Sequence, residues 1–430
     1  MKNKPLIIAS ISLIAAIFLS ASVKSNSNKI SAELPPDAES KPTFSSVSAS
    51  NNQEMRAVWV PFMSLNMKDT DYSEAAFKTK FDNIIEESLA HNMNTLIVHV
   101  RPFNDALYPS DYFPWSHLIS GEQGKNPEFD PLDYMITATH KAGLQFHAWI
   151  NPLRIQINNM PSLCESNVYY SLKNGSNPED IIMETSNGKY LNPAYPNVRE
   201  LIINGVKEVV EKYPVDGVQF DDYFYPDIVN VINGEFFVTI NAEVDKIAYG
   251  NYCNLPGNNQ PLSLEEWRFA NINALISGVY SAIKSINANV VFGISPGGNI
   301  NNQAKIGADI LTWCNTPGYI DYICPQIYFS PDHPKLPSTT AFASWKNIVG
   351  CDKVKLYFGL AAYKAGSETD DFGTWKNHDD ILKTQVEQGR HLGCDGFMFF
   401  SFEDFKKPRA SLELQNVKAI LNSSAILPKQ

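Results

Sequence analysis

Positive charge is scarce in this 430-residue sequence, and several widespread motifs are missing. The chain carries 35 Lys and Arg against 46 Asp and Glu, a net charge of −11, and it shows no basic stripe. Nucleic acids and anionic membranes bind through clustered basic residues, so neither is an expected partner. The sequence also lacks a complete GxGxxG or Walker pattern, which argues against phosphate binding.

Cysteine is also sparse. The six cysteines are widely spaced and form no CxxC pair or metal-ligand spacing. An exported protein could pair some of them, but several lie in or beside apolar segments, where buried free thiols are favoured. This spacing predicts no cysteine metal site, and we expect no cofactor.

No apolar run at the N-terminus is as long as a typical membrane span. Lys2 and Lys4 precede an apolar run from Leu6 to Leu19 that is followed by small residues. This layout is typical of a secretory signal peptide, which we place at residues 1–22. Residues 23–53 are rich in Ser, Asn, Lys and Pro and predict a disordered linker. The protein is expected to be secreted or extracytoplasmic, with an uncleaved N-terminal anchor as the alternative.

Residues 54–425 contain eight short apolar segments, nearly all separated by a helical pattern or by a long loop and a helix. Eight alternating units predict the α/β class and a single (β/α)8 TIM barrel rather than an open sheet. Long loops follow three of the strands at the C-terminal face, where barrel enzymes place their sites, at residues 103–129, 153–196 and 226–261. The expected strands are residues 56–63, 95–102, 144–152, 217–225, 290–298, 322–330, 355–364 and 396–405.

The segment 215–226 passes from a buried strand into two adjacent carboxylates, Asp221 and Asp222, and a cluster of aromatics. Alternate side chains of a strand point to opposite faces, so the apolar set of each strand predicts which polar residues face into the barrel. Asp222 has the wrong parity unless the strand bends there. The residues expected to face inward are His99, Arg101, His147, Trp149, Asn151, Gln219, Asp221, Ser295, Gln326, Tyr328, Tyr363, Ser401 and Glu403.

Carboxylates at a barrel mouth, with aromatic and amide neighbours, are what acid-assisted glycosidic cleavage needs. One carboxyl group with a raised pKa protonates the leaving oxygen, while another group stabilises the oxocarbenium-like transition state or activates water. We expect Asp221 to be the acid or principal carboxylate, Glu403 its facing partner and Asp105 a third possibility. Arg101 would hold a carboxylate ionised or bind the substrate. The expected sugar platforms are Trp115, Tyr223, Tyr225 and Tyr328.

Structural roles compete with these assignments. Arg101 and Asp221 could form no more than a structural ion pair. His99 and His147 fit satisfied core histidines, because no metal spacing accompanies them. Glu403 has the weakest independent support and could be a surface residue.

Several motifs, taken together and in one order, resemble the glycosyl-hydrolase-like family ten. The resemblance runs from about Glu54 to Phe405 and is specific in combination. The motifs are residues 56–60 (RAVWV), 100–110 (VRPFNDALYPS), 114–116 (PWS), 129–132 (FDPL), 147–152 (HAWINP), 216–226 (DGVQFDDYFYP), 293–296 (GISP) and 325–328 (PQIY).

The resemblance implies an exported bacterial (β/α)8 glycoside hydrolase that acts on cell-wall (peptidoglycan) glycan or another amino-sugar polymer. It implies site positions at Arg101, Asp105, Asn151, Asp221 and Asp222. Three positions depart from the family pattern: Asn104 and Ala194 stand where Gly is expected, and Asn192 stands where Asp is expected. These departures leave the loop conformations and the identity of the substrate open.

The fourth strand is also similar to the chitinase-type pattern DGxDxDxE. Gln219 stands at the first inner Asp of that pattern, Asp221 at the second and Tyr223 at the Glu. The usual acid is therefore missing, and either Asp221 or Asp222 takes its role or the acid comes from another strand.

The leading hypothesis is an endo-acting glycoside hydrolase that binds a polysaccharide and uses Asp221 with a second carboxylate, Asp222 or Glu403. A route assisted by a 2-acetamido group of the substrate is open if the sugar is an amino sugar. The rival is a non-catalytic glycan-binding barrel, and a third hypothesis is a divalent cation site. The expected substrate contacts are Arg101, Asp105, Trp115, His147, Asn151, Tyr223, Ser295, Gln326, Tyr328 and Tyr363.

Overall fold

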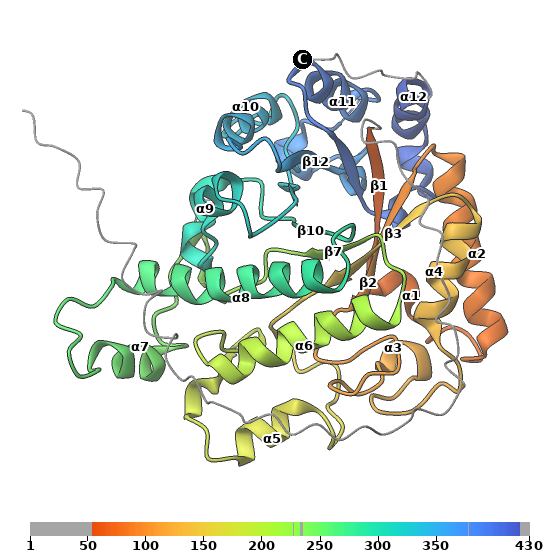
Figure 1. The fold of residues 1–430 in the computed structure, drawn as a ribbon. Helices are drawn as coiled ribbons and strands as arrows, with labels where there is room; N and C mark the ends of the chain where they lie inside the picture. Colours follow the sequence, from red (N-terminus) through yellow and green to blue (C-terminus); the bar gives the residue numbers. More distant parts are fainter. Residues whose placement is uncertain (1–53, 227, 233–234, 377, 422–430) are drawn as a thin grey trace, which may run out of the picture. The chain divides into compact units, whose positions relative to one another are not determined.

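Eight parallel strands form a closed barrel in a computed structural model that describes residues 54–226, 228–232, 235–376 and 378–421. The predicted signal peptide and linker, and residues 422–425 at the expected end of the barrel, lie outside the described residues. Helices surround the strands (Figure 1), so the predicted TIM barrel is confirmed. In spatial order the strands are β1 (Met55–Val60), β13 (Gly396–Phe400), β12 (Lys355–Ala361), β11 (Tyr322–Ile323), β10 (Val291–Ile294), β7 (Gly217–Phe220), β3 (Gln145–Ile150) and β2 (Thr95–Arg101).

Side-chain caps fix the starts of several outer helices. Ser73 accepts a hydrogen bond from the backbone N–H of Ala76, Asp130 caps the helix that starts at Pro131, and Ser263 forms a capping box with Glu266. The longer helices are α2 (Glu74–Ala90), α4 (Pro131–Lys141), α6 (Pro196–Lys212), α8 (Leu264–Ile286), α10 (Ser338–Ile348), α11 (Ile381–His391) and α12 (Ser411–Leu421). The shorter ones are α1 (Phe62–Leu65), α3 (His117–Ser120), α5 (Val168–Asn174), α7 (Lys246–Cys253) and α9 (Ile310–Asn315).

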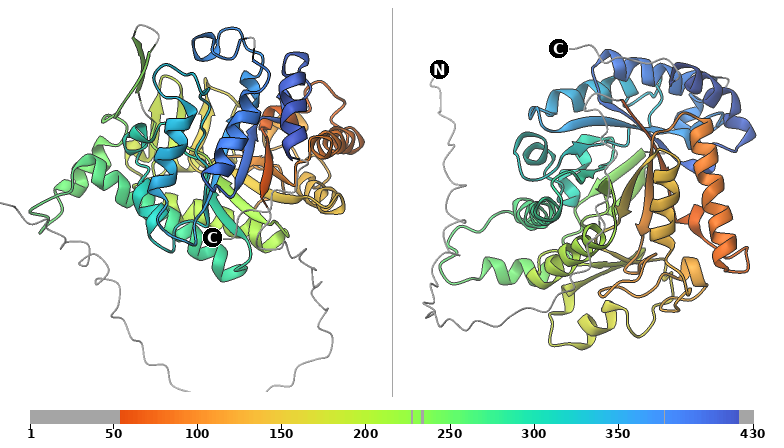
Figure 2. Two further views of the ribbon diagram at one scale, coloured as in Figure 1. Left: turned by 90° about the horizontal axis from the view of Figure 1, so that it is seen from above. Right: turned by 45° about the vertical axis from the view of Figure 1, so that its right-hand side comes forward.

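The outer helices pack in neighbouring pairs around the barrel. α2 lies beside α4, α6 beside α8, and α11 beside α12 (Figures 1 and 2). Strand alternation divides the buried side chains as predicted. Leu96, Val98 and Phe146 belong to the large core between strands and helices, whereas Ile97 and Trp149 belong to a smaller cluster inside the barrel.

The two longest loops predicted from the sequence contain additional structure. Loop 153–196 holds an antiparallel sheet of β4 (Arg154–Ile157), β6 (Gly188–Leu191) and β5 (Ile182–Thr185). Loop 226–261 holds the hairpin of β8 (Ile228–Ile232) and β9 (Glu235–Thr239), followed by α7. Both loops follow strand ends on one face of the barrel, so this face carries the extra walls that a binding site needs.

Short 3-10 turns complete the connections. They are η1 (Glu179–Ile181), η2 (Ile300–Asn302), η3 (Ala304–Ile306), η4 (Ala362–Lys364), η5 (Asp370–Gly373), η6 (Phe402–Asp404) and η7 (Pro408–Ala410). All six cysteines are free thiols. Within the described part of the chain, no helix combines the length and the apolarity needed to cross a membrane.

Candidate active site

Asp221 lies directly after β7, at the point where the strand opens into a cavity. Its carboxylate accepts a hydrogen bond from Trp149 Nε1 at 3.0 Å and from Asn151 Nδ2 at 3.2 Å. Both donors come from the neighbouring strand β3 and the residue after it, because β3 pairs in parallel with β7. We call Trp149, Asn151 and Asp221 the carboxylate wall.

Burial sets the protonation of Asp221. Asp221 is only 4% exposed, and this loss of solvent raises the pKa of its carboxyl group. The positive charge of Arg154 and the hydrogen bonds from Trp149 and Asn151 oppose that rise. A carboxyl group with a raised pKa is suited to donate a proton to a leaving oxygen.

The cavity in front of Asp221 has a volume of about 300 Å³. Its walls are mostly aromatic and its polar groups converge from several strand ends, which is the usual composition of a small-ligand site. It is lined by Trp59, Pro61, Phe62, Met63, His99, Trp149, Arg154, Asp221, Asp222, Tyr223, Ser295, Gln326, Tyr328, Tyr363 and Phe400. Among the described lining residues, Asp221 and Asp222 are the carboxylates, and both come from the end of β7.

Arg154 supplies the positive charge of the cavity. Its Nε donates to the backbone oxygen of Pro102 at 2.9 Å, and its guanidinium lies 4.8 Å from the ring centroid of Tyr223 and 5.1 Å from that of Phe103. The backbone N–H of Arg154 donates to Asn151 Oδ1 at 3.1 Å. Asn151 therefore connects the arginine segment to the carboxylate of Asp221.

His99 stacks on Trp149 with ring centroids 3.7 Å apart and an interplanar angle of 11°. Burial, and secondarily the charge of Arg154, lower the pKa of His99 well below its usual value, so the imidazole is neutral at pH 7. On the barrel side, Trp59 Nε1 donates to Gln219 Oε1 at 2.8 Å. These contacts fix the rings of His99, Trp149 and Trp59 at the border of the cavity. They also hold Trp149 in place as a hydrogen-bond donor to Asp221.

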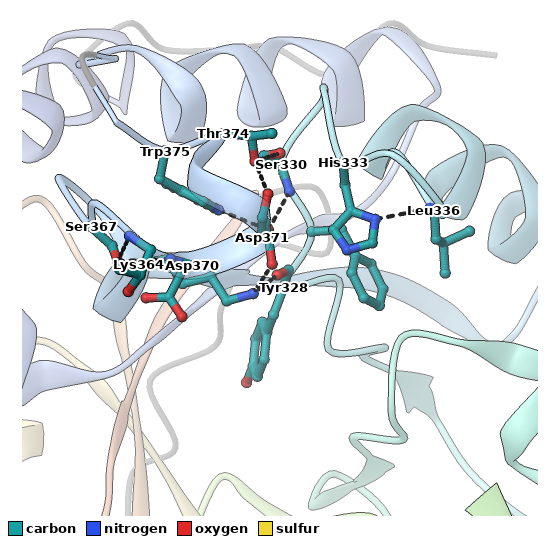
Figure 3. A network of polar contacts seen from close by, with 12 residues as sticks. Tyr328, Ser330, His333, Leu336, Lys364, Ser367, Asp370, Asp371, Thr374 and Trp375 are labelled. Carbon is teal, nitrogen blue, oxygen red and sulfur yellow. Dashed lines mark hydrogen bonds and ion pairs between the residues drawn. The ribbon is translucent and has the colours of Figure 1, made fainter. Parts of the chain in front are cut away.

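Tyr328 and Tyr363 follow β11 and β12, and we call them the aromatic wall. Their rings meet edge to face with centroids 5.7 Å apart. Lys364 Nζ donates to the backbone oxygen of Tyr328 at 2.6 Å and forms an ion pair with Asp371 Oδ1 at 2.5 Å (Figure 3). Asp371 Oδ2 also accepts from Trp375 Nε1 at 2.8 Å and from the backbone N–H of Ser330 at 2.9 Å. The charged pair thus lies behind Tyr328 and holds its backbone.

Seven of the predicted site residues line the cavity. The strand β7 ends at Phe220, so the chain has bent before Asp222, and both aspartates border the cavity despite their sequence parity. Asn151, another predicted residue, reaches the site through its contact with Asp221. The seven lining residues are Asp221, Asp222, Tyr223, Ser295, Gln326, Tyr328 and Tyr363.

Arg101 does not face the cavity, and its predicted inward orientation is wrong. The register of β2 against β3 shifts between His99 and Arg101, so Arg101 pairs with the outward-facing Ile150. Its guanidinium lies 4.2 Å from the ring centroid of Phe113. A Cβ atom at Gly205 of α6 would come within 2.4 Å of Arg101 Nη1, so the glycine leaves room for the buried arginine.

Glu403 was expected to face Asp221, and this prediction is also wrong. The strand β13 ends at Phe400, three residues earlier, and Glu403 is exposed in the short turn η6. Its neighbour Asp404 is buried instead and accepts hydrogen bonds from Ser401 and Lys407.

Three further predicted contacts lie away from the cavity lining. Asp105 is buried in the loop after β2, where Gln123 Nε2 donates to its carboxylate at 3.0 Å. His147 lies inside the barrel next to Tyr322, and Trp115 is half-buried in the same loop as Asp105. Within the described residues no group of three His, Cys, Asp or Glu could hold a metal ion, and Asp105 does not join the two aspartates as the cation hypothesis requires.

Sequence reasoning missed several residues of the site. Arg154 lies beyond the expected strand, and Phe62 and Met63 lie in a short helix that was read as strand. Trp59 and Phe400 could have been found by extending the alternation rule to the first and last strands. His99 and Trp149 were placed inside the barrel, but neither was assigned to the site.

Comparison with known proteins gives a family match over most of the barrel. A family model described as Glycosyl hydrolase-like 10 matches residues 54–377. Glycosyl hydrolase YngK of Bacillus subtilis is 32% identical over 401 residues, covering 89% of this chain and 74% of that protein. Glycosyl hydrolase DigH of Escherichia coli K12 is 31% identical over 428 residues, covering 92% of this chain and 93% of that protein.

Solved structures share the fold at low sequence identity. The PgaB (BpsB) glycoside hydrolase domain from Bordetella bronchiseptica aligns with a TM-score of 0.54 and 14% identity, covering 88% of this chain and all of that one. An endo-1,4-beta-mannanase from Rhizomucor miehei aligns with a TM-score of 0.53 and 11% identity, covering 87% of this chain and 96% of that one.

Proposed function

Because the chain belongs to the Glycosyl hydrolase-like 10 family and is a glycosidase, we propose that it cleaves O-glycosidic bonds within an amino-sugar polysaccharide, such as the glycan strands of the bacterial cell wall. The observation that carries the proposal is the buried carboxyl of Asp221 at a cavity lined by aromatic rings. Aromatic faces bind the apolar faces of sugar rings, and the carboxyl group acts on the bond between two of them.

Asp221 acts as the acid in this proposal. Its pKa is raised by burial, so it retains a proton to a higher pH than an exposed aspartate does. Asp222 is half-buried and lines the same cavity, where it stabilises positive charge that develops on the sugar or orients the attacking group.

Asp221 and Asp222 both extend from the end of β7, so a separate test asks whether the substrate itself supplies the nucleophile. Enzymes with two protein carboxylates place them on either side of the bond that is cut. If a 2-acetamido group of the sugar provides the nucleophile, a cyclic analogue of the resulting oxazoline will inhibit competitively. Substrates whose sugar lacks the acetamido group will then not be cleaved.

Export is the second part of the proposal. Residues 1–22 begin with charged residues, continue with an apolar run and end with small residues, which is the layout of a signal peptide. This layout supports export across the cytoplasmic membrane, to the side on which cell-wall glycan is accessible. Detection of the mature N-terminus in the culture medium or in a membrane fraction separates a released form from an anchored one.

The test is product release from purified cell-wall glycan strands, with and without stem peptides, by wild type and Asp221→Asn side by side. We expect cleavage by wild type and a loss of about 100-fold or more in the variant, because general acid catalysis contributes about 10²–10⁴. Asp332→Asn alters an exposed aspartate outside the cavity and serves as the matched control. Binding without turnover by wild type would instead favour the non-catalytic glycan-binding barrel.

A further inference from the structure

A second cavity adjoins the first on the other side of Asp222 and Tyr223. Its volume is about 570 Å³, and these two residues line both cavities. Tyr223 is 46% exposed, and its ring is held by the guanidinium of Arg154 at 4.8 Å. The two cavities are therefore neighbours that share Asp222 and Tyr223 as a common border.

The lining of the second cavity is neutral apart from Asp222. Among the described residues, hydroxyl and amide groups come from the end of β5, the turn that follows it and the segment after β9. Aromatic rings come from β6 and the segment after β7. The lining consists of Thr185, Ser186, Asn187, Tyr190, Asp222, Tyr223, Phe224, Tyr225, Pro226, Asn241 and Ile306. Rings together with hydroxyl and amide groups suit an uncharged polyhydroxylated ligand, and they offer no cation to an anionic one.

The inner side of this cavity is rigidly built. The Tyr225 ring lies 4.5 Å from the guanidinium of Arg268, which forms a fully buried ion pair with Asp245 at 2.7 Å. The backbone N–H of Tyr225 donates to the oxygen of Ile306 at 3.1 Å. A binding surface that is already ordered avoids part of the entropy cost of binding.

We propose that the second cavity is a binding site for a further uncharged pyranose unit of the same glycan chain, so that the chain extends past Tyr223 and is cut internally. This inference rests on the proposed function, because it assigns the substrate of these two cavities. Tyr190 and Asn187 would contact this unit and would make no contact with the sugar held in the first cavity, whose lining includes neither residue.

The test compares Tyr190→Ala and Asn187→Ala with wild type on β-1,4-linked N-acetylglucosamine oligosaccharides, a disaccharide and a hexasaccharide. Affinity is measured by calorimetry in an Asp221→Asn background, and kcat/KM is measured in the active enzyme. We expect each variant to weaken hexasaccharide binding about threefold to tenfold, with a parallel fall in kcat/KM, while disaccharide values stay within twofold. Tyr170→Ala removes an exposed tyrosine outside both cavities and is the matched control.

The outcomes separate this inference from the proposed function. If wild type binds and cleaves the hexasaccharide but both variants behave like wild type, or if the variants weaken both ligands equally, the second-cavity assignment is overturned and the proposed function stands. If wild type neither binds nor cleaves either oligosaccharide or cell-wall glycan, both fail. Asn187 lies in an exposed turn, so its variant remains informative even if Tyr190→Ala does not fold.

Discussion

The carboxylate wall and the aromatic wall face the same cavity but use buried charge in opposite ways. The carboxylate wall turns the buried carboxyl of Asp221 toward the cavity, with Trp149 and Asn151 as hydrogen-bond donors. In the aromatic wall the ion pair of Lys364 and Asp371 is absent from the cavity lining, and the ring of Tyr328 is presented instead. One wall therefore carries reactive charge, and the other uses charge to position an uncharged surface.

This difference predicts different kinetic consequences for changes in the two walls. A group whose contact strengthens in the transition state affects kcat, whereas a group that binds substrate and transition state equally affects KM. The carboxylate wall should belong to the first class and the aromatic wall to the second.

Asn151→Ala tests the carboxylate wall and should have the larger effect. Its amide donates to Asp221, and its Oδ1 accepts from the backbone N–H of Arg154, so the variant releases both. We expect kcat to fall about 10- to 100-fold, since small displacements of catalytic groups cost about that much. Asn192→Ala removes a similarly buried asparagine that does not line the cavity and controls for lost stability.

The same variant should alter the pH dependence. The hydrogen bond from Asn151 lowers the pKa of Asp221, so its removal raises that pKa further. An acid must be protonated to act, so wild-type activity falls as the pH rises through the pKa of Asp221, and in Asn151→Ala this fall moves to higher pH. A shift to lower pH, measured from kcat against pH, would exclude Asp221 as the acid.

Asp371→Asn tests the aromatic wall and should have a smaller effect on catalysis. Breaking a buried ion pair costs about 3–5 kcal/mol of stability, which a lower Tm will report. Because Lys364 also holds the backbone of Tyr328 (Figure 3), we expect KM to rise about threefold to tenfold with kcat within twofold. Tyr328→Leu should reproduce the rise in KM without the full loss of Tm. A fall in kcat as large as that in Asn151→Ala would remove the distinction between the walls.

The sequence allowed the barrel and the position of Asp221 at the end of its strand to be predicted, but not every side-chain direction. Apolar alternation with helical spacing is local information, and it placed all eight strands and Asp221. The orientation of Arg101 depends on a bulge in the pairing of β2 with β3, which is a tertiary feature without a local signal. Arg154 enters the site from β4, because the loop after β3 folds back as a sheet that the sequence pattern did not indicate.

Glu403→Gln provides the smallest expected effect and defines where the carboxylate wall ends. Its side chain is exposed in η6 after β13, and it is not part of the cavity lining. Exposed substitutions of this kind change stability by about 0.5 kcal/mol or less, and we expect kcat/KM to stay within twofold of wild type. A loss comparable to that of Asp221→Asn would mean that η6 moves to bring Glu403 to the substrate. The catalytic pair would then span two strand ends, and Asp222 would lose its proposed role.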